Sequence, residues 1–384
     1  MEVIKRALIS FCLLYIAVSK IGATAEELES EIQMIMDKYH AIGLSIVTVK
    51  NNQIFYAQSF GYNPDYNDLT RREPIPIDGI FVIQSISKTF ISTAIMQLAE
   101  KGKLKLDDDV SKYLPFEVRN PQYPKIPITI RMLMSHRSTL NDKQYDWTFN
   151  QINPKIGKKW QECYNDYPPG TKFSYCNFNY QLLGIIIESI TGKRFFDYID
   201  EHITQPLGLN ASYNLTKIDS TKLVKALRNE RAKNKFVKDS LIYNYSYYEK
   251  QLQNYKLETT AACFSPSGGM KISVVDLAKY MMMHMNNGKY NGIRILKEKS
   301  ELEMRRPLAA DTTYALGFFS NKDILKGETV VGVWGNAHGV HSAMYFSPEK
   351  KFGFVVLCNG CMADERKFKD SIAYAMYRYL IKGK

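Results

Sequence analysis

Long hydrophobic runs are scarce in this 384-residue sequence, which limits how the chain can meet a membrane. The one marked run, Ala7–Val18, is about 12 residues long, whereas a helix needs roughly 20 apolar residues to span a bilayer. Lys5 and Arg6 precede this run, and the small residues Ala23–Ala25 follow it. This three-part pattern predicts a secretory signal peptide over residues 1–25, with an uncleaved N-terminal anchor as the alternative. We therefore expect a periplasmic or secreted protein.

Cysteine is also sparse, with six residues, and Cys12 lies within the predicted signal peptide. The five that remain are an odd number, so at least one thiol is unpaired within the chain. Cys358 and Cys361 have the spacing of a redox motif, but they follow the strand-like run Phe354–Leu357 instead of opening a helix. This context argues against a thioredoxin-like function. One structural disulfide stays open as an alternative.

No nucleic-acid recognition motif accompanies the basic charge of the chain, whose formal net charge is +12. Much of this charge lies in Lys217–Lys238, where basic residues outnumber acidic ones. We interpret this segment as a solvated helical face and expect no nucleic-acid partner. A weak association with an anionic cell envelope is compatible with the same charge.

Internal repeats and low-complexity linkers are absent, so the architecture follows from local patterns. Apolar runs predict strands near both ends of the chain, at residues 41–50, 53–60, 330–334, 343–346 and 352–357. Apolar residues at helical spacing predict helices at residues 26–40, 85–101 and 368–381. We expect an α+β fold, an antiparallel β-sheet flanked by N- and C-terminal helices and interrupted by a mostly helical insertion. The predicted boundaries place the sheet domain at residues 26–102 and 264–384, and the insertion at residues 103–263.

Ser85 and Lys88 are the first candidates for chemistry. On a helix, residues three apart lie on one face, so the amine of Lys88 can reach the hydroxyl of Ser85. A serine hydroxyl needs a neighbouring base to become a nucleophile, and a helix start adds backbone N–H groups that suit a developing oxyanion. The same Ser-x-x-Lys pattern recurs at Ser347 and Lys350, where Pro348 and a turn-like setting provide no helix to align it.

Tyr175 and Asn177 form the second candidate pair, in the one Tyr-x-Asn sequence of a chain with 26 tyrosines. They directly precede an apolar helical segment. A tyrosine whose proton affinity is lowered by a neighbouring cation can act as a general base. The amide of Asn177 can orient Lys88 and the substrate. The alternative is a loop with a buried tyrosine.

With these motifs in view, the chain resembles the serine β-lactamase and penicillin-binding superfamily, in the class C branch that includes D-aminopeptidases and family VIII esterases. Ser85-x-x-Lys88 resembles its nucleophile motif, and Tyr175-x-Asn177 resembles its second motif. Flanking segments agree in order, namely Leu104–Pro115, Ile128–His136, Pro206–Leu209 and Ser265–Met270. The resemblance spans nearly the whole mature chain and implies an acyl-enzyme mechanism at Ser85, without a metal or another cofactor.

The third motif departs from the family pattern. Relatives carry Lys-Thr-Gly or His-x-Gly on the strand beside the nucleophile, and the matching positions here are Val333, Trp334 and Gly335. The missing cation argues against penicillin as the preferred substrate. The strand can still offer a backbone N–H, which we assign to Asn336, opposite that of Ser85. We therefore expect Asn177, Trp334, Gly335 and Asn336 to bind substrate.

Three histidines remain to be placed. His338 or His341 could replace the missing polar group of the third motif. A metal pair is the alternative, but no third ligand is visible. His136 lies in a segment that is structural in relatives, and we interpret it as a packing or hydrogen-bonding residue.

The sequence thus predicts a serine hydrolase that cleaves an ester or amide of a small molecule or peptide, with Ser85, Lys88 and Tyr175 as catalytic residues. The alternatives within the class are a D-Ala-type carboxypeptidase or aminopeptidase and a class C β-lactamase. The alternative of another class is an inactive, penicillin-binding-like binding protein. Five tyrosines either line the cleft or belong to a solvated loop, namely Tyr243, Tyr245, Tyr247, Tyr248 and Tyr255.

Overall fold

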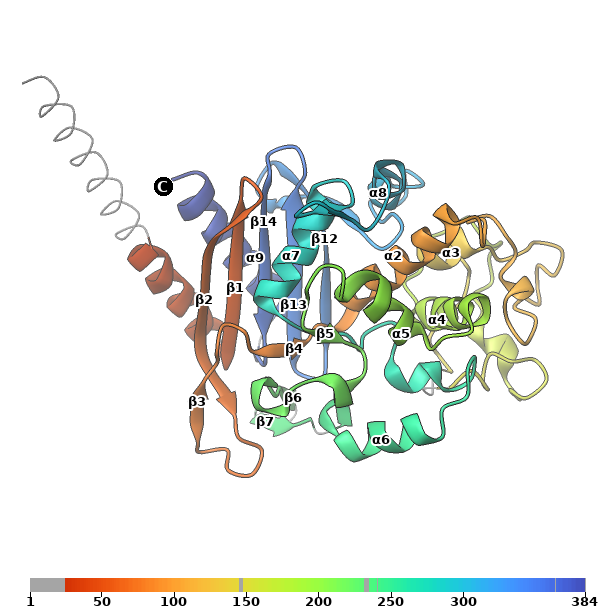
Figure 1. Ribbon diagram of the computed structural model, residues 1–384, viewed down its shortest axis with the longest axis horizontal. Helices are drawn as coiled ribbons and strands as arrows, with labels where there is room; N and C mark the ends of the chain where they lie inside the picture. Colours follow the sequence, from red (N-terminus) through yellow and green to blue (C-terminus); the bar gives the residue numbers. More distant parts are fainter. Residues whose placement is uncertain (1–24, 145–147, 231–234, 240, 363, 384) are drawn as a thin grey trace, which may run out of the picture.

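The computed structural model describes residues 25–144, 148–230, 235–239, 241–362 and 364–383 (Figure 1). The predicted signal peptide lies outside the described residues except for Ala25, so it stays a prediction. No helix in the described ranges is long and apolar enough to cross a membrane. Within the described part of the chain, the five cysteines from Cys163 to Cys361 form no disulfide bond.

A seven-stranded antiparallel sheet forms the centre of the molecule, in the order β11-β12-β13-β14-β1-β2-β3. It confirms the predicted antiparallel sheet built from both ends of the chain (Figure 1). The sequence patterns missed β11 and the short edge strand β3. The bounds are Gly43–Lys50 (β1), Gln53–Pro64 (β2), Arg72–Pro74 (β3), Phe319–Leu325 (β11), Glu328–Ala337 (β12), Val340–Ser347 (β13) and Phe352–Cys358 (β14).

Both faces of this sheet are covered, which explains why β1 is almost continuously buried. Leu44 and Ile46 point into a core shared with α9 and the N-terminal helix at residues 25–39. Val47 and Val49, of the opposite parity, point into the larger core that contains α2 and α7. The nucleophile lies on this second side.

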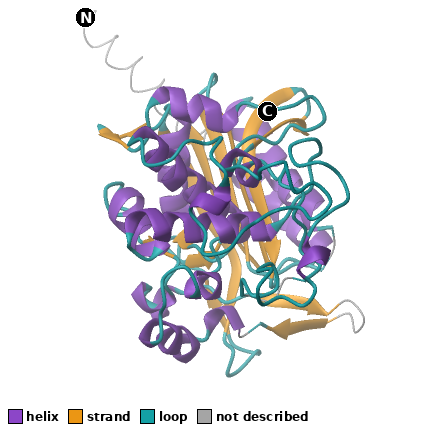
Figure 2. Ribbon diagram, turned by 90° about the vertical axis from the view of Figure 1, so that its right-hand side faces the viewer, coloured by secondary structure: helices purple, strands orange, loops and turns teal. Residues whose placement is uncertain are grey.

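The described helices lie on both sides of the sheet, and most of them gather on the side of α2 (Figures 1 and 2). The predicted C-terminal helix begins at Glu365, ends as an α-helix at Met376, and continues as one π-helical turn to Ile381. The helix bounds are Ser87–Glu100 (α2), Ile130–Met134 (α3), Asn177–Thr191 (α4), Phe195–Ile199 (α5), Tyr245–Gln253 (α6), Val274–Met285 (α7), Glu298–Arg305 (α8) and Glu365–Met376 (α9).

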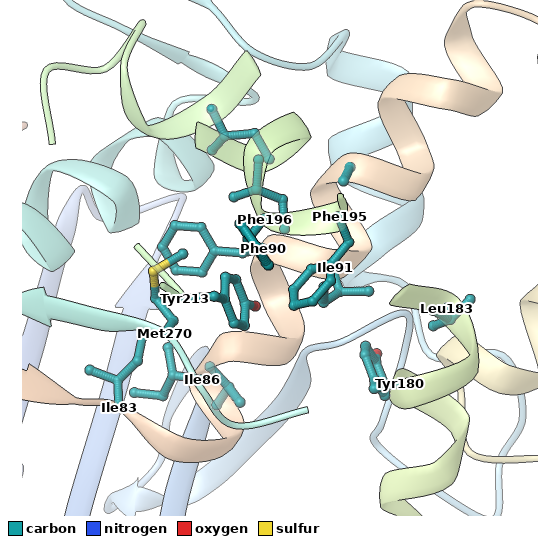
Figure 3. Close-up of a cluster of buried hydrophobic side chains, with 14 of the residues drawn as sticks. Ile83, Ile86, Phe90, Ile91, Tyr180, Leu183, Phe195, Phe196, Tyr213 and Met270 are labelled. Atoms are coloured by element: carbon teal, nitrogen blue, oxygen red, sulfur yellow. The ribbon is translucent and has the colours of Figure 1, made fainter. Parts of the chain in front are cut away.

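Helix α2 is anchored in the larger core along nearly its whole length. The ring of Phe90 stacks on Tyr280 with 3.8 Å between ring centroids. Figure 3 shows the surrounding cluster, in which Phe90 and Ile91 lie close to Tyr213 and Phe195. Burying one aromatic side chain stabilises a fold by roughly 1.5–3 kcal/mol, so this packing holds the residues of α2 firmly in place.

A small antiparallel sheet, in the order β4-β8-β5, connects distant segments next to α2. Its middle strand β8 pairs with β4, which leads directly into the turn that carries Ser85. The bounds are Ile80–Val82 (β4), Ala211–Ser212 (β5) and Lys271–Ser273 (β8). Another short pair consists of β9 (Lys289–Tyr290) and β10 (Ile293–Arg294). The domain boundaries at 102/103 and 263/264 stay a prediction.

The basic segment Lys217–Lys238 is not the helical face that its charge suggested. Its described residues form two 3₁₀ turns and the hairpin of β6 (Leu227–Glu230) and β7 (Lys235–Lys238). Lys217 pairs with Asp197 and Asp200, and Lys222 pairs with Asp78. Ion pairs with acidic residues outside the segment therefore hold it in place. The segment does not form a charged helix.

Candidate active site

Ser85 lies in a 3₁₀ turn, Gln84–Ile86, directly before α2. Gln84 adopts a left-handed backbone conformation with φ of 51°, which is costly for a residue other than glycine. The turn is held by its neighbours, since Ile83 N–H donates to the carbonyl of Met270 and the Ser342 hydroxyl donates to the carbonyl of Ile83. These contacts fix the direction in which the Ser85 hydroxyl points.

Lys88 is fully buried, and its amine lies next to the Ser85 hydroxyl. The Nζ atom is 3.0 Å from Ser85 Oγ, 2.9 Å from Asn177 Oδ1 and 2.8 Å from the carbonyl oxygen of Ser267. Burial lowers the pKa of Lys88 to about 7, although the nearby carboxylate of Asp142 acts in the opposite direction. A neutral amine, able to accept a proton, is therefore well populated at neutral pH.

Tyr175 completes the hydrogen-bonded group, with its phenol oxygen 2.7 Å from Ser85 Oγ. The residue is 44% exposed and borders the cleft. Desolvation raises the pKa of Tyr175 well above its usual range, against a smaller lowering by the hydrogen bond with Ser85. This raised pKa differs from the expectation that a neighbouring cation lowers the proton affinity of the tyrosine. A neutral phenol is better suited to pass a proton between Ser85 and Lys88 than to act as the base that holds it.

Asn177 begins α4 and is oriented by Asp142, a residue that sequence reasoning missed. The Asp142 carboxylate accepts hydrogen bonds from the backbone N–H of Asn177 at 2.8 Å and of Phe178 at 3.1 Å. It also accepts one from Asn177 Nδ2 at 2.9 Å, which turns Asn177 Oδ1 toward Lys88. Asp142 thus caps α4 and aligns the second motif, because an anion is favourable at a helix N-terminus.

His136 supports the second motif from behind, as expected for a packing and hydrogen-bonding residue. Its Nδ1 atom accepts a hydrogen bond from the backbone N–H of Cys176 at 3.2 Å. Its ring lies 4.3 Å from that of Tyr175, measured between centroids. Burial lowers the pKa of His136 well below its usual value, so the ring is neutral and places no second cation beside Lys88.

The third-motif strand, β12, approaches the nucleophile turn at Gly335. A β-carbon at this position would lie 2.7 Å from the carbonyl oxygen of Ile83, closer than such contacts allow. Val333 is on the same face and borders the cleft with an apolar side chain. The ring of Trp334 packs on the opposite side of the sheet, 5.5 Å from Lys369 Nζ, although the residue also borders the cleft. The side chain of Asn336 bonds to Lys369, which leaves its backbone at the cleft.

The two later histidines have different positions. His338 borders the cleft, and its Nδ1 atom lies 2.8 Å from a carboxylate oxygen of Asp239. His341 is buried, with its Nδ1 atom 3.3 Å from Asn336 Oδ1, and it does not line this cleft. Among the described residues, no three His, Cys, Asp or Glu side chains gather in a way that could hold a metal ion.

The second Ser-x-x-Lys sequence does not form a comparable group. Ser347 ends β13, and the Lys350 amine pairs with Glu328, not with the Ser347 hydroxyl. At the first pattern, by contrast, the side chains of Ser85, Lys88, Tyr175 and Asn177 meet at the wall of a cavity of about 660 Å³. Such a volume accommodates a small substrate.

Several known proteins are similar to this chain in sequence or in fold. Protein flp of Staphylococcus aureus (strain N315) is 26% identical over 344 residues, which cover 87% of this chain and 63% of that protein. This chain thus spans less than two thirds of the length of that relative.

Two further relatives cover most of the chain. The N-acetylmuramyl-L-alanine amidase of Bacillus subtilis (strain 168) is 27% identical over 298 residues, 73% of this chain and 67% of that protein. The octameric penicillin-binding protein homologue from Pyrococcus abyssi superposes with a TM-score of 0.73 at 25% identity, over 94% of this chain and 78% of that one. A profile of the Beta-lactamase family matches residues 28–375. The chain therefore belongs to the β-lactamase family.

Proposed function

We propose that this protein is a serine hydrolase that cleaves an ester or amide bond through an acyl-Ser85 intermediate. One observation carries the proposal: a buried Lys88 amine, with its pKa lowered to about 7, lies 3.0 Å from Ser85 Oγ. A general base whose pKa is near the working pH combines a populated basic form with a useful proton affinity. The names of relatives are consistent with this proposal, since one is an amidase.

The proposed acylation step begins with transfer of the Ser85 proton to the Lys88 amine, directly or through the phenol of Tyr175. Ser85 Oγ then attacks the substrate carbonyl carbon, and the carbonyl oxygen becomes an oxyanion. We assign its stabilisation to the backbone N–H groups of Ser85 and Asn336, because both residues border the cleft.

When the bond to the leaving group breaks, the proton returns from Lys88 through Tyr175 to the leaving oxygen or nitrogen. A water molecule next attacks the acyl group and gives its proton to the same pair. The acid is released, and Ser85 regains its hydroxyl.

The site supports a small-molecule or peptide substrate, held in the cleft between the sheet and the helical insertion. An amide of cell-wall peptide chemistry is the second candidate, favoured by the name of the Bacillus subtilis relative. The apolar Val333 wall provides no cation for a penicillin carboxylate, which makes a β-lactamase the weaker alternative. From residues 1–25 and the net charge of +12, we also infer export and a weak attraction to an anionic envelope.

The decisive experiment is intact-mass analysis after exposure to a fluorophosphonate, a p-nitrophenyl ester and a labelled penicillin. We expect a covalent adduct with the first two in the native sequence and none in Ser85→Ala. Labelling that persists in Ser85→Ala would overturn the assignment of the nucleophile. If the folded native protein forms no adduct with any of the three reagents, the alternative of an inactive, penicillin-binding-like binding protein is favoured instead.

A further inference from the structure

A second cavity, of about 240 Å³, opens beside the active site. It shares Gln84, Ser265, Gly268 and His338 with the main cavity, so the two spaces meet at the turn of the nucleophile. Its remaining walls are largely aromatic and aliphatic, including Tyr247 and Tyr248 of α6. Five tyrosines were expected either to line the cleft or to belong to a solvated loop. Tyr247 and Tyr248 are the two of them that border this second cavity.

Lys271 of β8 lines this second cavity and is completely buried. Its Nζ atom donates one hydrogen bond, of 2.6 Å, to the carbonyl of Tyr213 and lies 4.6 Å from the ring centroid of Tyr248. No carboxylate in the described ranges lies within ion-pair distance of it. Burial alone lowers the pKa of Lys271 to about 7, with no charged neighbour contributing. A buried cation without an anion is costly, so the site is suited to receive one.

A second donor lies in the wall that the two cavities share. The Nε2 atom of Gln84 is buried and has no hydrogen-bond partner among the described residues. A buried amide group that stays unpaired costs roughly 1–3 kcal/mol. Gln84 also holds its strained backbone conformation at this wall. An acceptor atom at the junction of the cavities would satisfy this donor.

The small sheet sets the distance between Lys271 and the nucleophile. Lys271 is opposite Val82 in the β4–β8 register, and Val82 is three residues before Ser85. The backbone N–H of Met270 donates to the hydroxyl of Ser87 at 3.0 Å, which ties β8 to the start of α2. A substrate with its carbonyl at Ser85 can therefore extend a short chain into the second cavity.

We propose that the second cavity is an acyl-chain subsite for substrates that end in a carboxylate, which the Lys271 ammonium binds with the assistance of the Gln84 amide. This inference rests on the proposed hydrolase function. A carboxylate carries one negative charge, which the single Lys271 cation neutralises. A dianionic phosphate would leave one charge buried among tyrosine rings without compensation.

The first test compares p-nitrophenyl monoesters of dicarboxylic acids, from succinic to suberic, with their methyl-capped neutral counterparts. For the best chain length, we expect the anionic-to-neutral ratio of kcat/KM to fall about 10- to 100-fold in Lys271→Met. Lys271→Gln keeps a donor for the Tyr213 carbonyl and should lower the ratio similarly, which covers a folding failure of the first variant. Lys299→Met, at an exposed position on α8, is the matched control and should keep the native ratio.

Unchanged ratios in both Lys271 variants would overturn the subsite. If the native protein hydrolyses none of these esters, the covalent labelling of Ser85 decides the proposed function, and a binding experiment decides the subsite separately. We expect calorimetric titration of Ser85→Ala to show tighter binding of hexanoate than of hexanamide. Adding Lys271→Gln should weaken hexanoate about tenfold or more. Equal affinities for the two probes, or no effect of Lys271→Gln, would refute the subsite without touching the role of Ser85.

Discussion

Two lysines, Lys88 and Lys271, are fully buried on the same side of the main sheet, and burial lowers the pKa of both to about 7. Their surroundings differ. Lys88 has three oxygen partners and the nearby carboxylate of Asp142, whereas Lys271 has one carbonyl and a tyrosine ring.

This difference teaches that a shared pKa does not imply a shared role. Three acceptors satisfy all the donors of a Lys88 ammonium, and the neutral amine keeps two of them while it faces Ser85. The group is therefore stable in both protonation states, as a base in a catalytic cycle needs to be. Lys271 has one carbonyl acceptor among the described residues, which leaves two of the three N–H donors of its charged form without an acceptor, so an anion would stabilise that form.

The largest expected difference between the two lysines is the effect of their removal on catalysis. We expect Lys88→Met to lower kcat/KM for p-nitrophenyl butyrate by about 10³- to 10⁴-fold, because the base that receives the Ser85 proton is gone. Steady-state kinetics with Lys299→Met as the control measures this effect. Retention of more than about a tenth of the native rate would exclude Lys88 as the base.

Replacing Asp142 tests whether the positioning of Lys88 distinguishes it from Lys271. We expect Asp142→Asn to lower kcat/KM about 10- to 100-fold, since the Asn177 amide loses its charged anchor. Because Asp142 opposes the lowering of the Lys88 pKa, the acid limb of the pH–rate profile should move to lower pH. Thermal unfolding should also show a loss of about 1–2 kcal/mol from the cap of α4. If the rate falls but the acid limb of the pH–rate profile stays at the same pH, Asp142 has a structural role only.

The pH dependence of kcat/KM in the native protein tests whether the neutral form of Lys88 is the catalytic base. Lys88 acts as a base only when neutral, so kcat/KM for a neutral ester should rise about tenfold per pH unit below pH 7 and level off above it. A stopped-flow or plate assay with an uncharged substrate measures this profile. A rate that falls as the pH rises through 7 would contradict the proposed role.

The last prediction concerns the stability of the fold. The unfolded chain holds the Lys271 proton up to about pH 10.5, whereas the folded chain gives it up near pH 7, so folding releases a proton between these values. Native stability should therefore rise with pH across this window. Lys271→Met should gain up to a few kcal/mol below about pH 7, and the gain should vanish toward pH 10.5. Urea unfolding at several pH values checks this, and a destabilised variant at pH 7 would show that the ammonium already has a partner.

The sequence predicted the parts of the site that depend on local spacing or on resemblance. Ser85 and Lys88 are one helical turn apart, and the resemblance supplied their long-range contact with Tyr175. Asp142 was missed because it acts across 35 residues from an irregular loop. Lys271 was missed because a three-residue strand has no readable pattern. Strand β11 was missed because its middle residues face solvent and are polar, so the sequence shows no apolar run there.

Gly335 and Val333, two residues apart on one face of β12, differ in how much change they tolerate. A side chain at Gly335 would press on the carbonyl of Ile83 and displace the nucleophile turn. Val333 already carries a side chain, which is buried and borders the cleft. A mutant library at position 333 can therefore search for new substrates while the acylating machinery stays in place, which makes this strand a natural starting point for directed evolution.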